Sequence, residues 1–154
     1  MALLADEDAK YLRDQFASLT TDVTLTLITR EKSKLVLPGA ATDEPEDSSA
    51  EVKQIVSEVA ATSPRIKVEE IDAQAEAERA RELAGELVPA ILFSGGRTKG
   101  KLRYFGLPAG YEMSTLVATL MDIGSNESMV PAEVATELSQ LATDIHIKVF
   151  VTPG

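Results

Sequence analysis

The sequence predicts an α/β fold in which a strand–helix–strand unit is followed by a strand–strand–helix unit. Two observations carry this prediction. Stretches with alternating apolar residues are separated by stretches with helical apolar spacing, an order that places helices on both faces of a sheet. In addition, an apolar run that begins at Pro89 is followed by a glycine-rich turn at residues 94–100 and a further strand, and together these predict a hairpin.

Composition indicates a globular protein and excludes several partners. The 154 residues are 44% hydrophobic and 26% charged, which is enough to bury a core. The formal net charge of −10 repels phosphate backbones and anionic lipid, so no nucleic acid or membrane partner is expected. No apolar run reaches the twenty or so residues of a spanning helix, and the N-terminal segment is acidic where a signal peptide is basic. A cytoplasmic location is therefore predicted.

The chain has no cysteine and one histidine. Disulfides, thiolate nucleophiles and cysteine metal sites are thereby excluded. His146 alternates with isoleucines and has no partner ligands nearby in the sequence, so we interpret it as a strand residue that faces the opposite side of the sheet. No metal and no cofactor are expected.

The first half of the chain predicts two helices and a strand. Residues 5–19 have apolar residues at helical spacing, and the β-branched alternation of residues 23–29 predicts a strand. Residues 30–47 combine prolines with acids and predict a solvated loop. Ser48 and Glu51 form a capping-box pattern, which predicts a helix from there to Ser63-Pro64.

The second half continues the alternation. Residues 65–71 predict a short strand, and Asp72 is the expected cap of a helix that Gly85 ends. Pairs Glu76–Arg79 and Glu78–Arg81 are expected on its exposed side. After a hairpin over residues 87–105, helices are predicted from about residue 112 to Gly124 and from about residue 131, and a last strand at residues 145–151.

Three stretches carry a resemblance to a known family. They are Val88-Pro89-Ala90, the run from Arg103 to Glu112, and the run from Ile147 to Pro153, of which residues 104–110 are the most specific. Together they resemble the first half of the two-unit, glutaredoxin-like protein disulfide oxidoreductases and, more distantly, the N-terminal domain of the flavoprotein subunit of alkyl hydroperoxide reductase. The resemblance covers nearly the whole chain. It implies a thioredoxin-like βαβ-ββα three-layer sandwich with an extra N-terminal helix and a C-terminal helix–strand extension.

The chain departs from that family at the catalytic position. Active members open the first helix of the sandwich with a Cys-x-x-Cys pair, where the helix N-terminus stabilises a thiolate. The corresponding tetrad here is Glu46, Asp47, Ser48 and Ser49, so we expect no catalytic residue there. The hydroperoxide reductase domain likewise has a first unit without the pair. The resemblance therefore implies a degenerate, redox-inactive unit.

Length is the second departure. The family continues beyond the matching Val-Phe-Val-Thr-Pro into a second unit with its own Cys-x-x-Cys, whereas this sequence ends at Gly154. We therefore divide the chain into a thioredoxin-like domain, residues 1–124, and a segment, residues 125–154, that forms a linker helix and the first strand of a missing or truncated second unit. Left uncovered, this strand predicts a homodimer or a swapped assembly through residues 131–151, although it could also join the edge of its own sheet.

Other motifs have simpler explanations. Residues 95–101 match most of a phosphate-binding loop, but Leu102 replaces its Ser or Thr and a strand follows instead of a helix, so we interpret them as a hairpin turn. The basic residues Arg97, Lys99, Lys101 and Arg103 are interpreted as charges that guard an edge strand. The acids at residues 43–47 lack the ligand spacing of a calcium loop.

Pro89 is the remaining candidate. In the thioredoxin fold the segment before a cis-proline offers its backbone to an extended peptide, which needs no cysteine. The resemblance thus implies a cis Val88–Pro89 bond and marks Leu87, Val88 and Pro89 as peptide-binding candidates.

Three functions compete on the sequence alone. The first is a non-catalytic thioredoxin-fold module that serves as scaffold or docking half for a redox-active second unit or a protein partner. The second is a stand-alone peptide- or protein-binding module that uses the groove beside Pro89. The third, an enzyme built on carboxylates such as Glu46 and Asp47, has least support because those acids lie in a loop without an organised partner.

Overall fold

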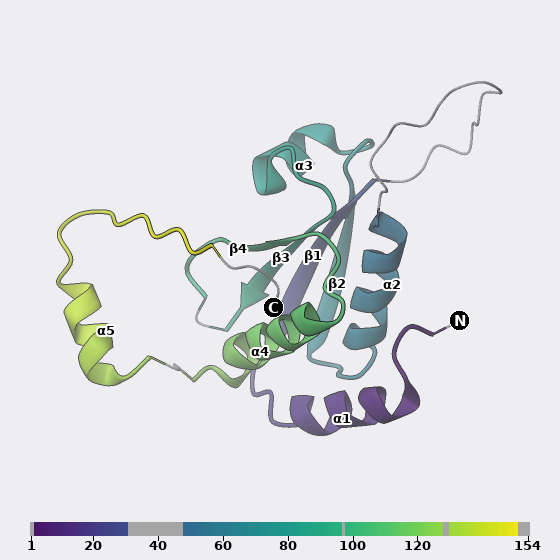
Figure 1. The fold of residues 1–154 in the computed structure, drawn as a ribbon, viewed down its shortest axis with the longest axis horizontal. Coiled ribbons are helices and arrows are strands. Elements are labelled where there is room, and N and C mark those ends of the chain that lie inside the picture. The colour runs from purple at the N-terminus through teal and green to yellow at the C-terminus, as the bar shows by residue number, and fades with distance from the viewer. Residues whose placement is uncertain (1, 31–47, 97, 128–129, 151–154) are drawn as a thin grey trace.

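A computed structural model describes residues 2–30, 48–96, 98–127 and 130–150 (Figure 1). Its elements are α1 (Asp6–Phe16), β1 (Val23–Thr29), α2 (Ser49–Ala60), β2 (Ile66–Asp72), α3 (Ala77–Ala84), β3 (Ala90–Gly95), β4 (Leu102–Phe105), α4 (Tyr111–Ser125) and α5 (Ala132–Ser139). The strands form one sheet in the order β2-β1-β3-β4. Strand β1 pairs parallel with β2 and antiparallel with β3, which pairs antiparallel with β4. The predicted order of strands and helices is confirmed from α1 to α5.

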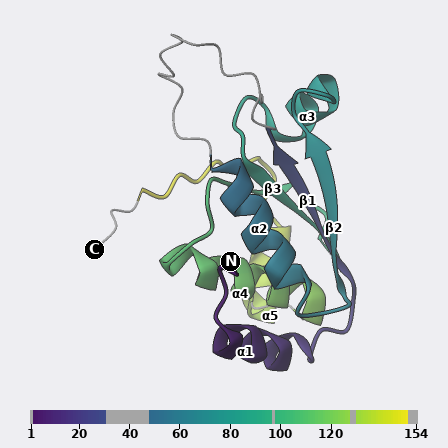
Figure 2. The same cartoon turned by 90° about the vertical axis from the view of Figure 1, so that its right-hand side faces the viewer.

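The domain has three layers. Helices α2 and α4 pack on one face of the sheet and α3 packs on the other (Figure 2). Strand β1 shows why: Val23, Leu25 and Leu27 alternate toward the α2 and α4 side and are fully buried, whereas Ile28 belongs to the smaller cluster under α3. Helix α1 contacts both α2 and α4, and its Leu12 and Phe16 complete the larger core.

Some element boundaries differ from the prediction. Strand β3 begins at Ala90 rather than Leu87, because Pro89 has no amide hydrogen for the ladder. Strand β2 is as long as β1 and pairs with it over seven residues, although a short strand was expected. The cross-strand ladder outweighs the break in its side-chain alternation, since β2 is an edge strand whose outer positions need not be apolar.

The caps also differ. Asp72 does not cap α3: its side chain accepts a hydrogen bond from Gln74 N in a turn, and α3 begins only at Ala77. The predicted Glu76–Arg79 pair is present, whereas Arg81 pairs with Glu86. Gly85 follows α3 at a positive φ of 74°, as predicted for a helix stop.

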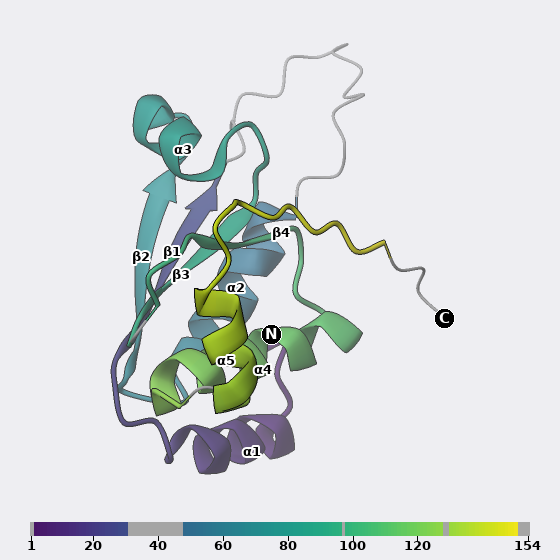
Figure 3. The same cartoon turned by 90° about the vertical axis from the view of Figure 1, so that its left-hand side faces the viewer.

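The C-terminal segment lies apart from the three layers (Figures 1 and 3). No residue of α5 is buried, and the apolar side chains of residues 144–150 are exposed. Residues 145–150, which the sequence predicts as part of a strand, form none here, because a strand needs backbone hydrogen bonds to a neighbour and these residues do not pair with the described sheet. Within the described residues, no helix is long and apolar enough to cross a lipid bilayer.

Candidate functional site

The N-terminus of α2 is the position at which the resemblance predicts a catalytic pair. Ser48 precedes the helix, and Ser49 is its first residue and is buried. The Ser49 Oγ accepts a hydrogen bond from Arg30 N at 3.2 Å, which ties the end of β1 to the start of α2. Glu46 and Asp47, the other half of the tetrad, lie outside the described residues. The hydroxyl at this helix N-terminus is thus a buried structural acceptor.

The predicted capping box is wrong. Ser48 has φ −80° and ψ 13° and makes no side-chain cap hydrogen bond. A capping serine normally has extended backbone angles that aim its oxygen at the amides of the first turn. The nearly helical angles of Ser48 turn its side chain away from that geometry, and Ser48 contributes its carbonyl oxygen, which accepts from Val52 N at 2.9 Å.

Pro89 lies immediately before β3, and its peptide bond with Val88 is cis. Pro89 is buried, Val88 is half-buried, and Leu87 is 60% exposed. The Pro89 carbonyl oxygen accepts a hydrogen bond from Gly106 N at 3.0 Å, so the start of β3 is fixed to the end of β4. The three candidate residues therefore run from solvent into the sheet.

A small hollow links the two halves of this region. It has a volume of about 160 Å³, and its lining includes Arg30, Val88, Gly85 and Arg81. Because Arg30 N also contacts Ser49, the hollow places the segment before Pro89 and the start of α2 at one end of the sheet. Strand β3 begins at this same end, since Ala90 pairs with Ile28 near the end of β1.

Two exposed apolar side chains flank Gly106, the residue that is hydrogen-bonded to Pro89. Phe105, 40% exposed, is paired with Ala90 across the β3–β4 ladder, and Leu107, 36% exposed, follows the glycine that binds the Pro89 carbonyl. Both side chains lie in the motif at residues 104–110, but no sequence pattern marks them as binding residues. What points to a binding role is the exposure of these apolar side chains close to Pro89, and that exposure is known only from the fold.

Tyr104 stabilises the exposed apolar rim that Phe105 and Leu107 form. Its hydroxyl donates to the Leu107 carbonyl oxygen at 3.2 Å. Partial burial raises the pKa of the Tyr104 phenol above its ordinary value, and the negative charge of Glu112 raises it further. The phenol thus remains a neutral donor in the physiological range, where it holds the turn that presents Leu107.

The remaining candidates do not join this site. Residues 95–101 connect antiparallel strands, the arrangement of a hairpin turn, and β4 is an edge strand. The basic residues of this hairpin that are described, Lys99, Lys101 and Arg103, are exposed. Arg97 lies outside the described residues. His146 is exposed in the C-terminal segment. Among the described residues, no group of three His, Cys, Asp or Glu side chains is placed to hold a metal ion.

The arrangement limits the chemistry that the site can perform. The chain contains no sulfur nucleophile, and thiol–disulfide exchange requires one. The site offers apolar contact at Phe105 near Pro89, beside the segment before β3 in which the Leu87 side chain is exposed. Such a surface is suited to binding an extended chain rather than to bond cleavage.

Several solved structures have a similar fold. The chain is similar to a protein disulfide oxidoreductase from Aeropyrum pernix K1, with a TM-score of 0.71 and 20% identity over 92% of this chain and 56% of that one. It is also similar to the alkylhydroperoxide reductase AhpF of Enterococcus faecalis V583, with a TM-score of 0.67 and 21% identity over 90% of this chain and 61% of that one. The isolated NTD_N/C domain of the same AhpF gives a TM-score of 0.68 and 20% identity over 88% of this chain and 59% of that domain.

These similarities confirm the predicted thioredoxin-like fold. The chain spans about three fifths of the length of the structures that it matches. No protein-family model and no curated protein sequence matches it.

Proposed function

We propose that this chain is a non-catalytic thioredoxin-fold module of the thiol–disulfide redox class, which serves as scaffold or docking half for a redox-active unit. The observation that carries the proposal is the occupant of the α2 N-terminus. A thioredoxin-like fold positions a thiolate there, and this chain has Ser48 and Ser49 and no cysteine anywhere.

The burial of Ser49 supports a structural role at this position. Its side chain is only 4% exposed and its oxygen is engaged by Arg30 N. An attacking group must reach solvent or substrate, and a buried acceptor cannot. The fold at this helix N-terminus has therefore been kept while its reactive group has been replaced.

An internal repeat supports a second unit as the partner. Val134, Leu138 and Leu141 stand the same 122 positions after Leu12, Phe16 and Leu19, and Thr143-Asp144 stands at that offset from Thr21-Asp22. The apolar alternation after Asp144 likewise follows that of β1. Since the three α1-side residues are core residues, their counterparts are expected to cover the core of another unit. We propose that residues 132–150 are the first helix and strand of that unit.

A second function is favoured by the exposed rim of Phe105 and Leu107. If Leu87 and Val88 offer their backbone to an extended peptide, these side chains would receive its apolar residues. The two functions are compatible in one protein, because docking a partner beside Pro89 requires no cysteine.

Insulin reduction tests the absence of intrinsic activity. The purified chain with dithiothreitol should precipitate insulin no faster than dithiothreitol alone, because no residue can form a mixed disulfide. Turnover above the reductant-only rate would overturn the proposal. An active thioredoxin in the same assay provides the positive control.

Downstream sequence and peptide binding separate the two functions. An open reading frame that continues past Gly154 into a unit with Cys-x-x-Cys supports the scaffold role, whereas a stop codon supports a stand-alone module.

For the groove beside Pro89, carboxymethylated insulin B chain is an extended probe without reactive thiols. Its binding should be weakened by Phe105→Ser and unaffected by Val134→Ser, which removes an equally exposed side chain far along the sequence.

A further inference from the structure

A second apolar surface lies between α1, α4 and the N-terminal segment. It is a groove with a volume of about 670 Å³, within the range of binding sites for other molecules. Its lining includes Met113, Val117 and Met121 from α4, with Leu12 from α1 and Ile55 from α2. Leu87, Val88 and Pro89 do not line it, so this groove is separate from the site beside Pro89.

The N-terminal wall of the groove is fixed in place. Leu3 and Leu4 line it, and their backbone amides both donate to the Glu58 carboxylate of α2, with Leu4 N at 2.7 Å from Oε2. Gln54 Nε2 donates to the same carboxylate at 2.8 Å. These bonds fix the N-terminal wall to α2, so the groove is formed without a bound partner.

The apolar stripe has the dimensions of a helix contact. Met113, Val117 and Met121 follow one another at four-residue spacing on one face of α4, and all three are half-buried. Eight residues of helix span about 12 Å, which matches the length over which an amphipathic helix places side chains i, i+4 and i+7. Two methionines also suit a surface that adapts to another helix.

The charge of the groove indicates which kind of helix it can bind. Asp8 lines the groove, and Asp6 and Glu7 lie in the same first turn of α1. Among the residues that the structure describes, no lysine or arginine lines the groove. Helix α5 of the same chain also has an apolar stripe. Its charged residues, Glu133 and Glu137, are acidic, so the acidic residues around Asp8 would repel them. The surface therefore complements an apolar helix whose flanks are basic.

We propose that the α1–α4 groove binds a basic amphipathic helix of a partner protein. The apolar side chains of the helix pack on Met113, Val117 and Met121, and a lysine or arginine on its flank pairs with Asp8. This binding surface goes beyond the proposed function, because neither the missing thiolate nor the groove beside Pro89 requires it.

A model helix provides the probe. A fluorescein-labelled peptide of about 18 leucines and lysines, with leucines at helical spacing, is compared with a scrambled peptide of the same composition and with a leucine–glutamate peptide of the same pattern. Fluorescence anisotropy with the full chain should show binding of the amphipathic basic peptide about tenfold tighter than either control. Equal binding of the scrambled peptide would mean non-specific attraction to an acidic protein and would overturn the proposal.

Matched variants locate the binding. Ala118 lines the groove and is exposed, so Ala118→Arg should fold normally and weaken binding about tenfold through bulk and like charge. Thr115→Arg adds the same charge at an exposed position of α4 outside the groove and should have little effect. Asp8→Asn should reduce the salt dependence of binding more than Asp6→Asn does. Equal losses for the two arginine variants, or a homodimer that Ala118→Arg dissociates, would overturn the proposal.

Discussion

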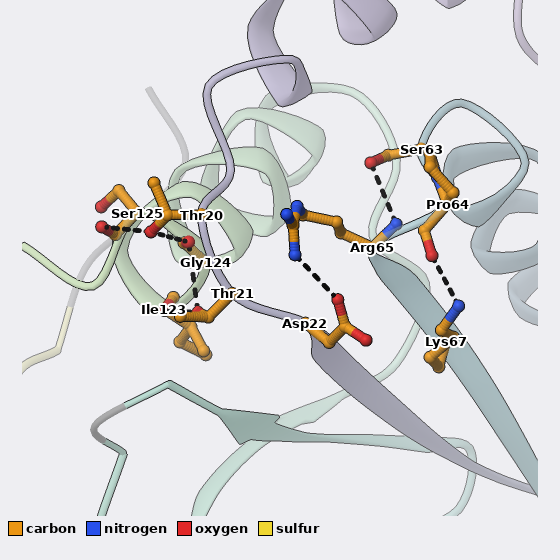
Figure 4. Close-up of polar contacts among 10 residues, drawn as sticks. All are labelled: Thr20, Thr21, Asp22, Ser63, Pro64, Arg65, Lys67, Ile123, Gly124 and Ser125. Atoms are coloured by element: carbon orange, nitrogen blue, oxygen red, sulfur yellow. Dashed lines mark hydrogen bonds and ion pairs between the residues drawn. The ribbon is translucent and has the colours of Figure 1, made fainter.

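The carbonyl oxygen of Gly124, near the end of α4, accepts a hydrogen bond from Thr20 N at 2.8 Å (Figure 4). Thr21 N donates to the same oxygen at 2.9 Å, and the Thr20 Oγ1 donates to the Ser125 carbonyl at 3.0 Å. Carbonyls in the last turn of a helix have no partner within the helix. The segment between α1 and β1 supplies those partners, so the end of α4 is fixed to the start of the sheet.

Helix α4 continues one residue beyond Gly124, and the hydrogen bonds from Thr20 and Thr21 hold its last turn. The sequence predicts Gly124 as a stop, yet α4 ends at Ser125, and Asn126 has the left-handed conformation with φ 60°. Gly124 instead packs closely on Leu19, since an added Cβ atom would lie 2.6 Å from Leu19 Cδ2 and the end of that side chain would have to shift. No local pattern reveals a neighbour more than a hundred positions away in the chain.

Gly96→Ala should strongly destabilise the fold. Gly96 has φ 51°, a left-handed conformation that costs a non-glycine residue about 1–2 kcal/mol. A Cβ atom would also lie 2.4 Å from the backbone carbonyl oxygen of Ile123, so either the hairpin turn or α4 must move. Urea unfolding followed by circular dichroism should show a loss of at least that size. Gly100→Ala, with no atom within 4 Å of its added Cβ, is the control, and an equal loss there would contradict the explanation.

Glu58 should make stability depend on pH. Hydrogen bonds from Leu4 N, Gln54 and Leu3 N lower the pKa of the Glu58 carboxyl below its ordinary value. A carboxyl with a depressed folded-state pKa contributes stability above its unfolded pKa, about 4.3, and loses it as pH falls through the lower folded pKa. Glu58→Gln should therefore flatten the decrease in urea midpoint from neutral pH into that acid range.

The control for this prediction is Glu82→Gln, which changes an exposed glutamate of α3. It should leave the pH dependence of the urea midpoint close to that of the unsubstituted chain. In amide exchange measurements, Leu3 and Leu4 should lose protection in Glu58→Gln at neutral pH. If protection is unchanged, the Glu58 carboxylate does not hold the N-terminal segment.

Ser49→Ala should destabilise the chain by about 1–3 kcal/mol, because it removes the acceptor of Arg30 N in a largely buried position. Ser57→Ala changes an exposed serine of the same helix and should have little effect. Chemical unfolding of both variants measures the difference. If Ser49→Ala leaves the free energy of unfolding unchanged, the Ser49 hydroxyl has no structural role.

Residue patterns predict the layers of this fold because each element has a strong local signal. The buried stripe of Val52, Val56 and Val59 and the alternation in β1 both depend on residues within a few positions of one another. The site was predicted only in part. Pro89 is marked by its chemistry, whereas the exposure of Phe105 and the bond between Ser49 and Arg30 depend on contacts between segments far apart in the sequence.

The C-terminal segment should cause self-association wherever no second unit covers it. Val134 and Leu138 of α5 and Leu141 just after it are 40–54% exposed, and the described residues that follow, 145–150, form no strand. Two copies related by a two-fold axis can pair these segments and bury both stripes. Size exclusion with light scattering should give a dimer mass for the full chain.

Leu138→Glu tests the source of that dimer. Because the Leu138 side chain is 54% exposed, the substitution should give a folded monomer with an unchanged circular dichroism spectrum. Thr136→Glu adds the same charge on the opposite face of α5 and should leave the dimer intact. Deletion of residues 144–154 should also yield a monomer, since it removes the strand that two copies would pair. A monomer mass for the full chain, unchanged by that deletion, would show that residues 131–150 do not associate.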